Sequence, residues 1–270
     1  MKRNILGLAA ALAVSLAGVG AASAADMAVK ARPMPVAVYS WTGCYIGASG
    51  GGKFVRARDT AYIPATLATP ESSYGLGTAE PDTWLIGGQV GCNYQTGNWV
   101  FGIEGDAHAQ RWSSLSTIGG VLPPLFVTGD QFGLSSDWQA SVRGRAGYAM
   151  DRTLFYVTGG VAFTEVKAYT NYIPVAFFPG TIAYDKKTLT GATVGAGVEY
   201  AFTNNLTVGV EGRYTWYGSE RFNSGSVAVF GAPGGPFVSS NTYRDVRIET
   251  GEILVKANWK FGPSAVVAKY

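Results

Sequence analysis

His108 is the only histidine of the chain, and its surroundings show which chemistry the sequence could support. A metal site needs several ligands, but no second histidine and no cysteine cluster accompanies His108. A hydrolase of the Ser–His–acid type would need a serine beside Asp106 and His108. Ser113, Ser114 and Ser141 are near these two residues in the predicted strand pattern, but nothing else in the sequence marks them as partners. The sequence therefore predicts no catalytic residue, no metal site, no cofactor and no enzymatic activity.

A glycine-rich run resembles a phosphate-binding loop. Residues 47–53 read GASGGGK. In a true P-loop a Ser or Thr that holds magnesium follows the lysine, and a helix begins there. Here Phe54 follows Lys53, and no helical pattern comes next. We therefore interpret the run as part of a strand and not as a nucleotide site.

Charged side chains recur on one side of several segments that alternate in polarity. Glu104 and Asp106 fall on the polar side of one alternating segment, and Arg143 and Arg145 fall on the polar side of the next. In a barrel this side would face the interior. Because an unpaired charge is costly in a narrow interior, we expect these groups to pair. The full candidate cluster is Glu104, Asp106, Arg143, Arg145, Glu199, Glu211, Arg213 and Lys256. Such a cluster could form a gate or polar path for solutes, or it could plug a structural interior, and we favour the second interpretation.

The two cysteines, Cys44 and Cys92, fall near the start of one segment and near the end of the next. Antiparallel neighbours bring a start beside an end, so a cross-strand disulfide is possible where the Cα atoms approach within about 4.4 to 6.8 Å. An oxidising compartment favours the bond. The alternative is two free thiols that behave as small apolar residues facing lipid.

The first residues determine in which solvent the rest of the chain folds. Lys2 and Arg3 precede an apolar run over residues 5–20, and Ala22-Ser-Ala24 is a small-residue cleavage site. This pattern predicts a secretory signal peptide that is cleaved after Ala24, with a retained anchor helix as the alternative. No later apolar run reaches the length of a spanning helix. An exported membrane protein without such helices must be a closed barrel.

The composition is unusual for a secreted soluble domain. Only 14% of the residues are charged and 13% are aromatic, with 37 glycines, whereas about a quarter charged is usual. The formal charge is +3. Loss of Lys2 and Arg3 leaves 21 − 2 = 19 basic against 18 acidic side chains. Since nucleic-acid binding needs a clustered basic face, we exclude nucleic acid as a partner.

Apolar and polar residues alternate with a period of two in eight segments, which is the pattern of strands with one lipid-facing side. Between residues 84 and 94, for example, Trp84, Ile86 and Val90 alternate with Gln89 and Asn93. The eight segments are 41–54, 84–94, 99–110, 135–148, 155–164, 188–202, 206–217 and 247–261. In the last of them, the apolar Leu254 breaks the inward rule. The prediction is an all-β, eight-stranded antiparallel transmembrane barrel.

Short and long connections alternate between these segments. Tight turns are expected at 96–98, 151–153 and 203–205, and long loops at about 59–82, 113–134, 169–186 and 218–246, which is the asymmetry of periplasmic turns and extracellular loops. Two aromatic girdles are also expected. The one near the turns comprises Trp41, Tyr94, Trp99, Tyr148, Phe155, Tyr200, Phe202, Trp259 and Phe261, and the other Trp84, Trp138, Phe163, Tyr214 and Trp216. A soluble lipocalin-like barrel is the alternative, with the apolar rows inside.

Three stretches of the sequence are distinctive: Tyr39-Ser-Trp-Thr-Gly-Cys-Tyr-Ile-Gly, Gly87-Gly-Gln-Val-Gly-Cys-Asn-Tyr-Gln and Val208-Gly-Val-Glu-Gly-Arg-Tyr. They resemble the small outer-membrane β-barrel (porin-like, OmpA/OmpX-like) family of alphaproteobacteria. The resemblance implies an eight-stranded barrel in the bacterial outer membrane, inserted by the outer-membrane assembly machinery and without catalytic residues. Barrels of this family usually end on an aromatic residue. Here either Phe261 or Tyr270 could be the insertion signal.

The expected organisation is a signal peptide (1–24), a periplasmic lead-in (25–40), the barrel (41–261) and a C-terminal extension (262–270). We expect outer-membrane lipid and lipopolysaccharide as surroundings, and the loops could bind a surface ligand. Three functions stay open at this point: a structural, surface-exposed protein of the cell envelope, a passive small-solute porin, and a loop-borne binder or adhesin.

Overall fold

The computed structural model describes residues 37–65, 70–118, 128–174, 180–230, 237–261 and 265–267. All of their regular structure is β-strand. Among these residues no helix is long and apolar enough to cross a membrane. The predicted signal peptide and residues 25–36 of the lead-in lie outside the described residues, so these boundaries stay predictions.

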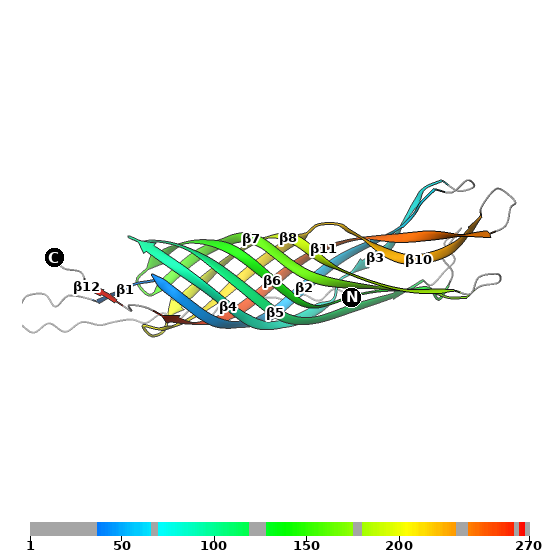
Figure 1. The fold of residues 1–270 in the computed structure, drawn as a ribbon. Helices are drawn as coiled ribbons and strands as arrows, with labels where there is room; N and C mark the ends of the chain where they lie inside the picture. The colour runs from blue at the N-terminus through cyan, green and yellow to red at the C-terminus, as the bar shows by residue number, and fades with distance from the viewer. Residues whose placement is uncertain are drawn as a thin grey trace, which may run out of the picture. The chain divides into compact units, whose positions relative to one another are not determined.

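Twelve strands are present in the described residues, and they are antiparallel throughout (Figure 1). They are β1 (Ala37–Tyr39), β2 (Gly43–Ile63), β3 (Ser72–Ala79), β4 (Asp82–Thr96), β5 (Trp99–Thr117), β6 (Gln131–Met150), β7 (Thr153–Tyr172), β8 (Thr181–Ala201), β9 (Leu206–Tyr217), β10 (Glu220–Phe230), β11 (Phe237–Phe261) and β12 (Ala265–Val267).

Ten of the strands form one sheet in the order β10-β11-β9-β8-β7-β6-β5-β4-β2-β3, and β11 also pairs with β2. This last pairing runs from Tyr243 opposite Tyr62 to Phe261 opposite Cys44 and closes the sheet into a barrel. β3 and β4 both pair with β2, and β9 and β10 both pair with β11, so each couple occupies one position in the wall. The ring therefore has eight strands, and the predicted fold class is confirmed.

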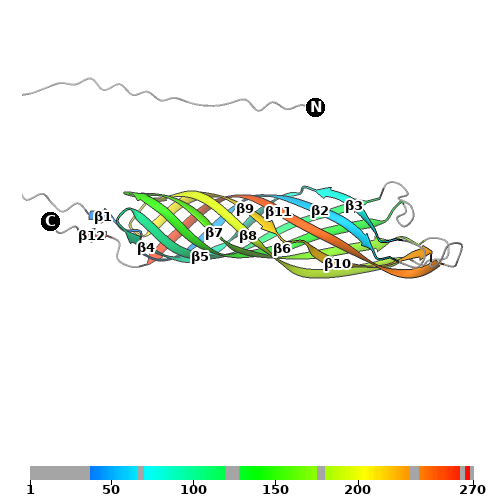
Figure 2. The same ribbon diagram turned by 90° about the horizontal axis from the view of Figure 1, so that it is seen from above.

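The three short connections lie where the sequence predicts them, but the expected long loops are wrong in extent. Most of their residues are strand: β2 continues to Ile63, β5 to Thr117 and β7 to Tyr172, while β8 begins at Thr181. In Figures 1 and 2 these prolonged strands form an extension of the barrel at the end opposite the short turns.

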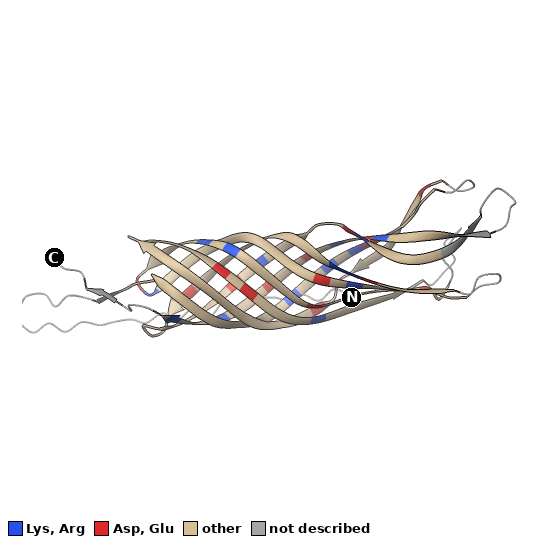
Figure 3. Cartoon of the chain, viewed as in Figure 1, with Lys and Arg blue, Asp and Glu red and all other residues tan. Residues whose placement is uncertain are grey.

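The outer face between the two aromatic rows is apolar, as the alternation predicts. Ile86, Ile103, Val142 and Val255 are each more than half exposed. At the level of this band the charged residues of the same strands, such as Glu104, Arg143 and Lys256, are buried and face the interior. Figure 3 shows acidic and basic positions on the strands of the barrel and, farther to the right, on the extension. Because a continuous band of exposed aliphatic side chains is favourable in an apolar solvent and unfavourable in water, this face fits the hydrocarbon core of a bilayer.

The polarity reverses in the extension. Inward side chains become apolar there and form one buried cluster that includes Val55, Trp112, Leu134, Val166, Leu189 and Ile248. Outward side chains become charged and include Arg56, Asp137, Lys167, Lys186 and Arg247. A β-structure with an apolar interior and a charged exterior is arranged for water. The extension therefore stands outside the lipid.

The two aromatic rows fall at the borders of the apolar band, with one exception. Tyr94, Trp99 and Trp259 are exposed near the short turns, and Trp84 and Trp216 are exposed near the extension. The expectation for Trp41 is wrong. Its side chain is buried inside the barrel mouth, and its indole Nε1 donates to the Asp151 carbonyl at 3.3 Å.

The two shortest strands pair with each other and form a separate two-stranded sheet. β1 pairs with β12, in the register Ala37 opposite Val267. The segment after Phe261 thus returns to the strand that precedes the barrel. The expected C-terminal extension therefore contains a strand.

Candidate functional site

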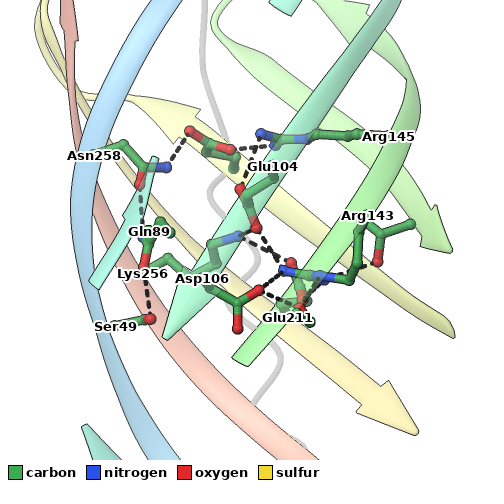
Figure 4. Close-up of polar contacts among 12 residues, drawn as sticks. Ser49, Gln89, Glu104, Asp106, Arg143, Arg145, Glu211, Lys256 and Asn258 are labelled. Atoms are coloured by element: carbon green, nitrogen blue, oxygen red, sulfur yellow. Dashed lines mark hydrogen bonds and ion pairs between the residues drawn. The ribbon is translucent and has the colours of Figure 1, made fainter. Parts of the chain in front are cut away.

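Four charged side chains form a closed ring of alternating sign inside the barrel (Figure 4). Arg143 lies 2.6 Å from Glu104 and 2.5 Å from Glu211, and Lys256 lies 2.6 Å from Glu104 and 3.0 Å from Glu211. The four residues come from β6, β5, β9 and β11. Because each cation contacts both anions, the ring links four strands of the barrel across its interior.

Two phenols complete the coordination of the carboxylates. The Tyr45 hydroxyl donates to Glu104 at 2.6 Å, and the Tyr156 hydroxyl donates to Glu211 at 2.9 Å. Arg145 pairs with Glu199 and stacks over the Tyr156 ring at 3.8 Å. All these side chains are buried. Satisfying each charge with several partners is what makes burial of ions tolerable.

A second group of charges continues the network toward the extension. Arg213 lies 3.1 Å from Asp106, 3.3 Å from Glu211 and 3.6 Å from Glu252. Glu252 in turn lies 3.3 Å from Lys53. With the ring and Arg145–Glu199, five acidic and five basic side chains occupy this part of the interior. They are Glu104, Asp106, Glu199, Glu211 and Glu252 with Lys53, Arg143, Arg145, Arg213 and Lys256.

The structure thus brings together all eight residues of the predicted cluster, and adds Lys53 and Glu252, which the sequence did not assign. Lys53 ends the glycine-rich run, which lies within β2, and Glu252 precedes the anomalous Leu254. Leu254 is inward and fully buried. The parity of Lys256 and Asn258, continued back along β11, is the signal that would have found Glu252.

Ser49, His108 and Asp106 form an arrangement with the composition of a hydrolytic triad. Ser49 Oγ lies 2.8 Å from His108 Nε2, and His108 Nδ1 lies 3.1 Å from Asp106 Oδ1 without the alignment of a hydrogen bond. Ser49 Oγ also donates to Gln89 Oε1 at 2.6 Å. The serine in reach of His108 is therefore Ser49, and not one of those considered from the sequence. All three side chains are buried, so a substrate has no approach to this serine.

Apolar layers enclose the charges on both sides. The buried residues of β5 show the order of these layers along the barrel axis, from the short turn toward the extension. They are Val100, Glu104, Asp106, His108, Gln110 and Trp112. Val100 belongs to a buried cluster at the mouth that contains Tyr39, Trp41 and Leu154, and Trp112 belongs to the large cluster of the extension.

A further closed layer lies beyond that large cluster. Arg244 is buried, pairs with Asp59 and donates to the Tyr169 carbonyl at 2.9 Å. Beyond it, Tyr172 shares a hydrogen bond with Thr242 at 3.1 Å. Burial raises the pKa of Tyr172 to about 12. Packed side chains therefore enclose the charged network on both sides, while a cavity of about 240 Å³ remains in the extension, lined by Ala57, Asp59, Phe132 and Arg244 among other residues.

Cys44 and Cys92 are directly opposite each other on β2 and β4 and are joined by a disulfide. Both residues are exposed on the outer face, and Cys92 lies two residues from Tyr94 on the side away from the short turn. The bond links the strand that closes the barrel to its neighbour. No group of three or more potential metal ligands occurs among the described residues.

The sequence and the fold can be compared with known proteins. Residues 9–261 match the family model described as the outer membrane protein beta-barrel domain. The 31 kDa outer-membrane immunogenic protein of Brucella melitensis is 32% identical over 256 residues, covering 89% of this chain and 93% of that protein. The 22 kDa outer membrane protein of Rhizobium leguminosarum is 34% identical over 186 residues, covering 68% of each.

Solved structures show a more distant likeness. The outer membrane protein OprG from Pseudomonas aeruginosa superposes with a TM-score of 0.49 at 14% identity, covering 82% of this chain and 97% of that one. The outer membrane protease OmpT from Escherichia coli has a TM-score of 0.47 at 9% identity, covering 83% and 98%.

Proposed function

Because this chain belongs to the outer membrane protein beta-barrel domain family, we propose that it serves the cell envelope as a structural, surface-exposed barrel with a non-conducting interior. It is a bacterial outer-membrane protein, as its relatives are. The observation that carries the proposal is the closed ring of Arg143, Glu104, Lys256 and Glu211, which crosses the lumen.

Three features support a closed interior. The ten charges of the network are balanced in number, so the network has no excess of one sign that would select a permeating ion. Apolar clusters lie on both sides of the charges, and an ion would have to lose its water to pass them. An eight-stranded barrel also has little room beyond its own side chains.

The extension supports surface exposure. Its charged outer face and apolar interior suit water, and it lies at the end opposite the short turns, which we place in the periplasm. Several relatives are named immunogenic outer-membrane proteins. Recognition of such a protein by antibodies requires segments exposed at the cell surface. In this chain we propose that the extension is the exposed segment.

We also propose that the barrel is not an enzyme, since Ser49 has no approach for a substrate. A liposome-swelling assay with small sugars tests the closed lumen. We expect liposomes with the refolded protein to swell no faster than protein-free liposomes. Swelling that depends on the size of the sugar would replace our proposal with the porin alternative.

A further inference from the structure

Arg58 on β2 and Arg247 on β11 are directly opposite each other across the seam that closes the barrel. Their neighbours Ala57 and Ile248 are buried, so both guanidinium groups point outward, with side chains 52% and 60% exposed. Two like charges at directly opposed positions of a sheet destabilise it unless a counter-charge lies between them.

Among the described residues, the counter-charge within 4.0 Å of this pair comes from Glu249. A single atom, Glu249 Oε1, lies 4.0 Å from Arg58 Nη1 and 3.9 Å from Arg247 Nε. The other oxygen of Glu249 accepts a hydrogen bond from Tyr214 at 3.1 Å. One carboxylate thus serves two guanidinium groups, and at these distances it makes a hydrogen bond with neither.

Two other exposed cations of the described extension are neutralised more closely. Arg221 makes two hydrogen bonds with Asp245, at 2.8 and 3.0 Å, and Lys167 lies 2.5 Å from Asp137. Arg58 and Arg247 therefore keep free donors and a net positive charge. A guanidinium fork matches the oxygens of a phosphate group, to which it can donate in pairs.

The height of the pair on the barrel identifies the kind of phosphate. Glu249 pairs in the ladder with Trp216, which belongs to the aromatic row at the border of the apolar band. Arg247 lies two residues farther out, which is about 7 Å along a strand. Charged groups at this level meet lipid headgroups, while the acyl chains contact the apolar band below.

We propose that Arg58 and Arg247 form a clamp for the phosphate of a phosphorylated glycolipid in the outer leaflet. The inference rests on the orientation given under the proposed function, in which the extension faces the cell exterior. The clamp would hold the lipid against the closing seam. It would also relieve the repulsion between the two arginines, so bound lipid would stabilise the barrel where its first and last strands meet.

Native mass spectrometry of the refolded full chain in detergent tests the clamp, with lipid A and enzymatically dephosphorylated lipid A as probes. We expect the Arg58→Gln/Arg247→Gln variant to bind phosphorylated lipid A about tenfold more weakly, because charge-assisted hydrogen bonds are lost. Arg221→Gln, whose cation is already paired, is the matched control and should bind like the unmodified protein. Dephosphorylated lipid A should bind the unmodified protein no better than phosphorylated lipid A binds the double variant.

Glu249→Gln provides an independent measurement if the double variant does not fold. It removes the competing carboxylate but keeps an oxygen for Tyr214, so binding of lipid A should become tighter. Unchanged binding by a folded double variant or by Glu249→Gln would overturn the proposal. Equal displacement of lipid A by inorganic phosphate would also overturn it, since the site would then bind the free ion. These outcomes do not depend on whether the lumen conducts.

Discussion

Arg143 on β6 and Glu211 on β9 meet at 2.5 Å although two strands, β7 and β8, separate them in the sheet. The contact crosses the barrel. Lys256 and Glu104 make a second crossing, with β2 and β4 between their strands. Because each cation also contacts the anion of the other crossing, the removal of one cation leaves two buried anions with too few donors.

Replacement of Arg143 by Gln should therefore destabilise the barrel strongly. Removing one partner of a buried ion pair costs roughly 3–5 kcal/mol, whereas an exposed pair contributes about 0–1 kcal/mol. Lys167→Gln, which breaks the exposed pair with Asp137, is the matched control. Urea unfolding of the refolded proteins in lipid vesicles, followed by tryptophan fluorescence, measures both changes. Equal losses for the two variants would indicate a hydrated, open lumen.

Two adjacent glycines of β2 should differ in their tolerance to alanine. A Cβ on Gly51 would lie 1.8 Å from the Ile253 carbonyl oxygen, whereas a Cβ on Gly52 would meet nothing within 4 Å. Gly51→Ala should cost about 1–3 kcal/mol through overpacking. Gly52→Ala should be neutral or slightly stabilising, since alanine restricts the unfolded chain more than glycine does. The same unfolding assay compares them, and a larger loss for Gly52→Ala would contradict the close approach of Gly51 to Ile253.

Ser49 should be unreactive despite its contact with His108. Its hydroxyl is buried and already donates to Gln89, so a fluorophosphonate probe should not label the folded protein. Mass spectrometry of the probe-treated protein measures the labelling, and Ser49→Ala is the control. Labelling that disappears in Ser49→Ala would contradict our view and restore the hydrolase as a candidate.

The orientation can be tested on intact cells with single cysteines placed in a Cys44→Ser/Cys92→Ser background. We expect a membrane-impermeant maleimide to label positions 73 and 128, at the extension, but not positions 98 and 204, at the short turns. Disrupted cells provide the control for reactivity at the turns. Labelling at position 98 in intact cells would reverse the proposed topology.

The strands of the membrane-spanning barrel could be predicted from the sequence because the bilayer imposes a single pattern of polarity on them. In the bilayer the outward residues must be apolar, so Ile86, Val142 and Val255 alternate cleanly with small or polar residues. The extension escaped prediction because that pattern ends at the membrane border. Outside the lipid the apolar side chains turn inward, as Trp112 and Leu134 do, and strands there resemble polar loops.

The interior was predictable only in part for a different reason. Parity shows that Glu104 and Arg143 face inward, and their pairing follows because β5 and β6 are neighbours. Contacts across the lumen, such as Arg143 with Glu211, depend on side-chain reach between strands that do not pair. The prediction for Trp41 was wrong because an aromatic residue at the end of a strand suggests an interfacial girdle. Trp41 instead precedes β2, so its side chain can turn into the barrel mouth.

The closed lumen is the central claim, and single-channel recording in planar bilayers tests it most directly. With the refolded full chain inserted, we predict no steady current steps above the protein-free bilayer in neutral salt. Insertion is verified independently by the heat-sensitive migration of the folded band on a gel. Stable, ohmic steps of uniform size whose ion selectivity changes in Arg143→Gln would contradict the account, because ions would then pass through the ring.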